Sequence, residues 1–134
     1  MIGTRLGGAL ILASLGASGQ SAPSDTALPS PLEAGWGGHK VCELLFENAE
    51  VRTLRCTFPP GSGHERHFHA PHWGYVQTGG TMRITSSTGT VVRELKSGAN
   101  WWSDGIAWHE AVNAGPTTAI YLIVEPKSAA APAN

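Results

Sequence analysis

Short runs of alternating apolar and polar residues, separated by glycine and proline, make up most of the chain after residue 40. The alternation predicts strands over residues 41–46, 51–58, 73–77, 82–85, 90–95, 99–102, 108–113 and 119–125. Turn-forming residues such as Pro59-Pro60-Gly61 and Gly79-Gly80 lie between the runs. Apart from a longer gap between the runs that begin at residues 51 and 73, successive runs begin about 8 to 12 residues apart, a spacing typical of sandwiches and barrels. Because no long helical period accompanies them, the pattern predicts an all-β fold.

A different pattern opens the chain. Residues 1–5 carry a positive charge, residues 6–15 are apolar, and the small residues Ala17, Ser18 and Gly19 follow. This order predicts a signal peptide over residues 1–19, and hence a periplasmic or secreted protein with no membrane association after cleavage. A frayed hydrophobic helix is the alternative. The apolar run is too short to span a bilayer, which takes about 20 residues.

Residues 20–34 are rich in serine, proline and alanine and show no apolar period, so we expect a linker or arm there. Residues 127–134 have the composition of a flexible tail. The folded domain is therefore expected to span residues 35–126.

The composition and charge of the chain bear on whether it binds nucleic acid. The 134 residues carry 9 Lys and Arg against 10 Asp and Glu, a formal net charge of −1, and no basic run. Because nucleic-acid binding needs a basic surface, it is not expected. The length suits one domain, and 17 glycines with 9 prolines suit many strands joined by tight turns.

The two cysteines, Cys42 and Cys56, lie on either side of the turn expected at residues 48–50. Their midpoint is position 49, so a regular hairpin would place them opposite each other and permit a disulfide. Two buried thiols are the alternative.

Four of the six histidines, His64, His67, His69 and His72, fall within nine residues, and His109 lies far along the chain. Imidazole is the commonest metal ligand, and several copies must converge on one point. Strand alternation places His67 and His69 on one face. His72 would face the other way unless a bulge at Ala70-Pro71 restores its phase. His64, like His39 nearer the N-terminus, is expected to be a solvated side chain.

The chain resembles the cupin family, whose metal ligands lie in two motifs on paired strands. The first motif is a glycine, a His-x-His pair, a Glu or Gln and a glycine turn. Here Gly63 (or Gly61) precedes His67-Phe68-His69 and Gly79 closes the motif, with His72 in place of the Glu or Gln.

The second cupin motif is matched by Gly98, His109 and Asn113 in spacing, while Asp104 and Ile106 replace the usual proline and glycine. The resemblance covers residues 41–125. It implies an all-β double-stranded β-helix, the cupin or jelly-roll barrel, and a homodimer. It also implies one divalent transition metal held by His67, His69, His72 and His109.

Four imidazoles make a neutral ligand shell and leave the charge of the metal uncompensated, which favours an anionic ligand. Such a shell suits Fe, Zn, Ni or Cu, and the expected metal is one of these or Mn. We expect a metal-dependent oxygenase or isomerase that acts on a small anionic or phenolic substrate. The alternatives are a non-catalytic module that binds or senses a small molecule, and a barrel that has lost its metal. Of Trp101 and Trp102, one is expected to face inward.

Overall fold

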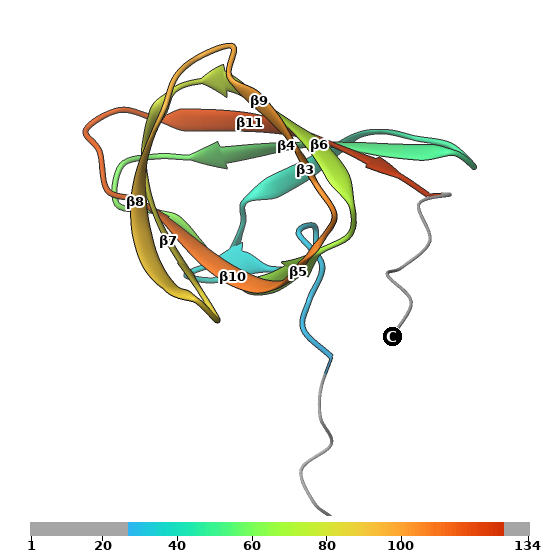
Figure 1. Ribbon diagram of the computed structural model, residues 1–134, viewed down its shortest axis with the longest axis horizontal. Helices are drawn as coiled ribbons and strands as arrows, with labels where there is room; N and C mark the ends of the chain where they lie inside the picture. Colours follow the sequence, from blue (N-terminus) through green and yellow to red (C-terminus); the bar gives the residue numbers. More distant parts are fainter. Residues whose placement is uncertain (1–26, 128–134) are drawn as a thin grey trace, which may run out of the picture.

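The computed structural model describes residues 27–127, whose two larger sheets are antiparallel, face each other and close into a barrel (Figure 1). The strands are β1 (Gly35–Trp36), β2 (His39–Lys40), β3 (Cys42–Glu47), β4 (Val51–Phe58), β5 (Gly63–His69), β6 (His72–Thr78), β7 (Gly80–Ser86), β8 (Gly89–Leu95), β9 (Asn100–Ser103), β10 (Ile106–Asn113) and β11 (Ala119–Pro126). The all-β prediction is confirmed, and each predicted range overlaps one strand, with bounds that differ by a few residues.

Three strands lie outside the predicted ranges: β5 and the short pair β1 and β2. The sequence of β5, GHERHFH, contains Phe68 as its one large apolar residue. A search for alternating apolar residues does not detect this strand, because its inward positions are histidines.

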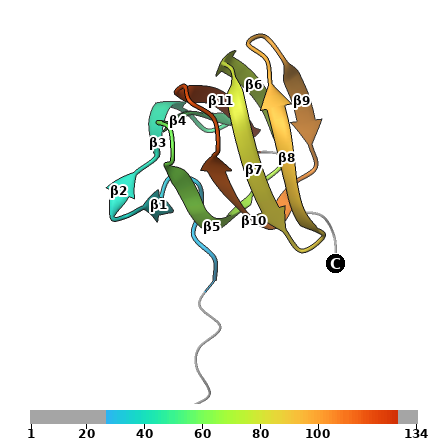
Figure 2. The ribbon, with the colours of Figure 1, turned by 90° about the vertical axis from the view of Figure 1, so that its left-hand side faces the viewer.

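One sheet has the strand order β5-β10-β7-β8 and the other has the order β3-β4-β11-β6-β9. Strands far apart in sequence pair in both sheets: β10 lies between β5 and β7, and β11 lies between β4 and β6. Figure 2 shows the β7–β8 hairpin as one wall of the barrel. The pairing of β10 with β5 brings His109 to the strand that carries the histidine cluster.

The core lies between the two sheets. Inward positions of successive strands supply buried side chains, among them Leu54 and Phe58 from β4, Met82 from β7 and Ile123 from β11. The alternation in β4 is regular, since every second residue from Leu54 to Phe58 is buried. This regularity is the physical basis of the strand prediction.

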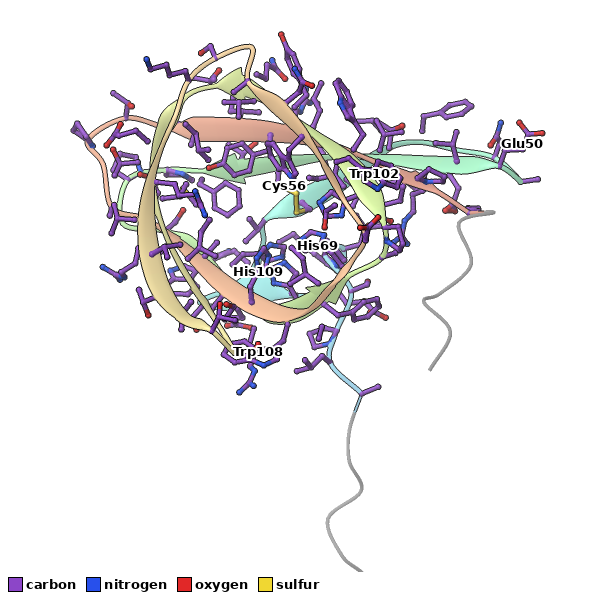
Figure 3. The ribbon with its side chains drawn as sticks, in the orientation of Figure 1. Glu50, Cys56, His69, Trp102, Trp108 and His109 are labelled. Carbon is purple, nitrogen blue, oxygen red and sulfur yellow. A yellow bond between two sulfur atoms is a disulfide. The ribbon has the colours of Figure 1, made fainter. Side chains whose placement is uncertain are left out.

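The β3–β4 hairpin contains the disulfide that the sequence permitted but left open against two buried thiols. Cys42 pairs with Cys56 in the register, and the two are covalently joined. Asn48 Oδ1 accepts hydrogen bonds from the backbone N–H groups of Glu50 and Val51, which closes the turn. Figure 3 shows Glu50 at the tip of this hairpin, which projects from the barrel. Between Leu44 and Phe46 β3 has one extra residue, and this register shift places Cys42 opposite Cys56.

The stretch from residue 27 to 34 lies against β5. Pro31 and Ala34 are buried, and the carbonyl of Pro29 accepts a hydrogen bond from the Phe68 N–H. This is the part of the expected arm that the structure describes; the expected signal peptide and the expected tail beyond residue 127 lie outside the described residues. Within residues 27–127 no helix is long and apolar enough to cross a membrane.

Candidate metal centre

Three histidine side chains converge inside the barrel. His67 and His69 lie on the inward face of β5, with 0% and 8% of their surface exposed, and His109 pairs with His67 from the neighbouring β10. The Nε2 atom of His67 lies 3.0 Å from His69 Nε2 and 3.1 Å from His109 Nε2. Figure 3 shows His69 and His109 side by side within the ring of strands. The structure therefore brings together three of the four predicted ligands.

Two irregularities in the β5–β10 pairing shape this cluster. Between the pairs Ala111–His64 and His109–His67, β5 has one residue more than β10. Between the pairs His109–His67 and Ile106–His69, β10 has one residue more than β5. An extra residue reverses the inward-outward phase of a strand. As a result, His64 and Ile106 join the inward face, which simple alternation would not predict.

The donor atoms suit a divalent transition metal. The Nδ1–H of His67 donates to the carbonyl of Glu65, so the lone pair of His67 Nε2 faces the other two rings. Two metal–nitrogen bonds of about 2.0–2.1 Å, at angles between octahedral and tetrahedral, separate the nitrogens by about 2.8–3.4 Å. The observed 3.0 and 3.1 Å lie in that range. One donor atom from each of His67, His69 and His109 lies within 4.8 Å of the others.

The cluster is held in its neutral, ligating form. Burial lowers the pKa of all three histidines, that of His109 to about 3, and repulsion between neighbouring imidazoles adds to the effect for His69 and His109. His69 Nδ1 is buried with no hydrogen-bond partner among the described residues. At pH 7 the three rings are therefore ready to bind a cation without first losing a proton.

His72 reaches the same cavity by a route that the sequence interpretation had wrong. The expected bulge at Ala70-Pro71 is absent, because β5 ends at His69 and β6, which begins at His72, belongs to the opposite sheet. The His72 ring centroid lies 4.8 Å from that of His69, and its Nδ1–H donates to the Ala70 carbonyl at 2.8 Å. His72 lies outside the group of three converging donors. Its role as a fourth ligand stays a prediction.

His64 is the residue that sequence reasoning missed. It is 2% exposed, not solvated as expected, and burial lowers its pKa to about 4. Its Nε2–H donates to the Pro31 carbonyl at 3.1 Å, and its ring centroid lies 3.8 Å from that of His67. The His64 ring therefore packs against the His67 ring. His39 on β2 is exposed, as expected.

The histidines line a cavity of about 490 Å³ between the two sheets, with an otherwise largely apolar wall that includes Phe58, Met82, Ile84, Leu95, Trp101 and Tyr121. Trp101 is the inward-facing member of its pair, whereas Trp102 is 54% exposed. Gly74 gives Trp101 its place, since a Cβ there would lie 2.2 Å from the indole ring. Trp108 lies outside the barrel under the Arg66 guanidinium (Figure 3).

Comparisons with known proteins agree on the fold. No family model matches the chain, and no curated protein matches it. A cupin domain from Bordetella pertussis Tohama I has a similar structure, with a TM-score of 0.62 and 21% identity over 66% of this chain and 93% of that one. A cupin with a double-stranded β-helix from Methanocaldococcus jannaschii has a TM-score of 0.54 and 16% identity over 64% and 78%. The polyketide cyclase RemF from Streptomyces resistomycificus has a TM-score of 0.53 and 20% identity over 63% of each chain. The predicted double-stranded β-helix is therefore confirmed.

Proposed function

We propose that this chain is a metal-dependent enzyme with a cupin fold, an oxygenase or isomerase acting on a small anionic or phenolic substrate. The observation that carries the proposal is the convergence of the Nε2 atoms of His67, His69 and His109 on the wall of a largely apolar cavity. A divalent transition metal bound there would act as a Lewis acid or activate oxygen. Three protein ligands leave coordination positions open, as in catalytic sites.

The protein's own residues give this site its selectivity. The imidazoles are neutral and, among residues 27–127, no aspartate or glutamate lines the cavity, so an anion entering it meets no carboxylate. The apolar wall limits the water that competes with the substrate. The Nδ1–H of His72 donates to the Ala70 carbonyl, which leaves the lone pair of that ring on Nε2.

Elemental analysis of the natively purified protein tests the proposal. We expect one equivalent of a first-row transition metal, and loss of that metal in His67→Ala and His109→Ala. Protein with a fully loaded site that converts no organic acid, phenol or diketone in a broad screen would overturn the enzymatic part. An empty site after native purification would overturn both parts.

A non-catalytic binding module is the second candidate. It is favoured by the absence of a carboxylate that could act as general acid or base among the described residues lining the cavity. A small molecule that raises the melting temperature of the loaded protein without forming product would support this alternative.

We also propose export and homodimer formation. The N-terminal pattern and the disulfide support an oxidising compartment such as the periplasm or the exterior. Three exposed aromatic residues on the outer face of the five-stranded sheet, Phe46, Trp73 and Trp102, support a dimer. Cell fractionation with N-terminal sequencing tests export, which a mature chain retaining Met1 would contradict. Light scattering after gel filtration tests the dimer.

A further inference from the structure

Arg93 occupies an unusual position for a charged side chain. It lies on β8, an edge strand of the four-stranded sheet, directly opposite Met82, which is fully buried. Because directly paired residues share a face of a sheet, Arg93 projects from the cavity side of β8. It lines the cavity together with Leu95, two residues along the same strand, yet it remains exposed to solvent. This combination places it at the mouth of the cavity.

The guanidinium of Arg93 also has no counter-charge. Among the described residues no ion pair or hydrogen bond engages it, and no aspartate or glutamate shares the cavity lining. The neighbouring Glu94 accepts a hydrogen bond from Thr81, which lies opposite it in the register. Guanidinium presents a planar fork of donors that matches a carboxylate. An unpaired arginine facing an apolar cavity therefore has the chemistry of an anion subsite.

We propose that Arg93 binds the carboxylate of an elongated, amphipathic substrate whose opposite end lies at the histidine cluster. This inference rests on the proposed function of that cluster. His109 pairs with Ser86 on β7, whereas Arg93 pairs with Met82 four residues away, a strand length of about 13 Å. Ile84 lies between the two ends, Met82 lies level with Arg93, and both side chains line the cavity. The substrate class is therefore a carboxylate with an apolar body, not a two-carbon diacid.

A different role for Arg93 would be protection of the sheet edge. Inward-pointing charges on edge strands discourage edge-to-edge association between molecules. Such a role would make Arg93 important for solubility but not for the choice of ligand. The two roles therefore differ in one measurable respect: only a subsite distinguishes a carboxylate from its neutral amide.

The test uses two probes that share a hydroxamate head and a six-carbon chain and end in a carboxylate or in the primary amide. Isothermal titration measures their binding to the zinc-loaded full chain, to Arg93→Gln and to Arg83→Gln. Arg83 is a matched control, because it lies on β7 next to Met82 but is exposed and absent from the cavity lining.

We expect the parent chain and Arg83→Gln to bind the acid about tenfold more tightly than the amide, as for one charge-assisted hydrogen-bonded pair. The preference should vanish in Arg93→Gln and weaken as salt is added. If Arg93→Gln bound the acid and the amide probe with the same affinity ratio as the parent chain, the subsite would be overturned, whether or not that variant aggregates. Failure of every variant to bind either probe would do the same. Zinc content is measured separately and tests the proposed function. Loss of zinc would not by itself remove the preference for the acid probe over the amide probe.

Discussion

Asn113 gives the sharpest test of how the second motif holds the barrel together. The side chain is 1% exposed and connects three backbone groups. Its Nδ2 donates to the carbonyls of Phe58 and Thr117 at 2.8 and 2.7 Å, and its Oδ1 accepts from the Gly115 N–H at 2.9 Å. It therefore ties the end of β10 to the end of β4 and to the loop before β11.

Asn113→Ala removes all three hydrogen bonds and leaves two carbonyls and one N–H without their partner. At about 1 kcal/mol for each bond, the free energy of unfolding should fall by about 3 kcal/mol. For a domain of this size that corresponds to a fall in melting temperature of roughly 12–24 °C. Urea unfolding at constant m-value measures the free energy, and a thermal scan measures the temperature.

Asn100→Ala is the matched control, since Asn100 is exposed and its side chain accepts one long hydrogen bond, at 3.4 Å, from Trp73. It should change stability by less than about 0.5 kcal/mol. If Asn113→Ala cost less than about 1 kcal/mol, the reasoning that this amide ties the loop to the barrel would be refuted.

Three further predictions concern the histidines and the disulfide. His109→Gln should weaken zinc binding by at least about a hundredfold, because it removes one of three ligands, while His39→Gln on the exposed β2 should leave it unchanged; a competition titration with a chelator decides. Opening the Cys42–Cys56 bridge with Cys42→Ser/Cys56→Ser should cost about 3 kcal/mol, the value for a loop of about 15 residues, and equal unfolding midpoints for the double variant and the parent chain would contradict this. The metal-free protein should lose stability as the pH falls from about 6.5 toward 4, because burial holds the folded pKa of His64 at about 4 and of His109 at about 3, so the unfolded chain binds more protons in this window. Urea midpoints across that window that stay level would show that the buried imidazoles do not control acid stability.

Local patterns by themselves predicted most of the strands, a hairpin that could place Cys42 opposite Cys56, and His67 and His69 on one face of a strand. Side-chain alternation has a fixed period of two, so it can be read without knowing which strands pair. His109 was assigned to the cluster by the resemblance to the second cupin motif, whose spacing reflects one strand and the turn before it.

The tertiary structure decided what depends on pairing between strands. The extra residue in β5, which buries His64, is defined only by its register against β10. His72 faces the cavity because the chain passes from one sheet to the other at Ala70-Pro71, which a sequence read as one continuous strand does not reveal. Trp101 faces inward, and not Trp102, because it lies opposite Gly74, where there is no side chain to exclude it. A bulge, a change of sheet and a cross-strand contact all join residues from separate strands, so only the folded barrel specifies them.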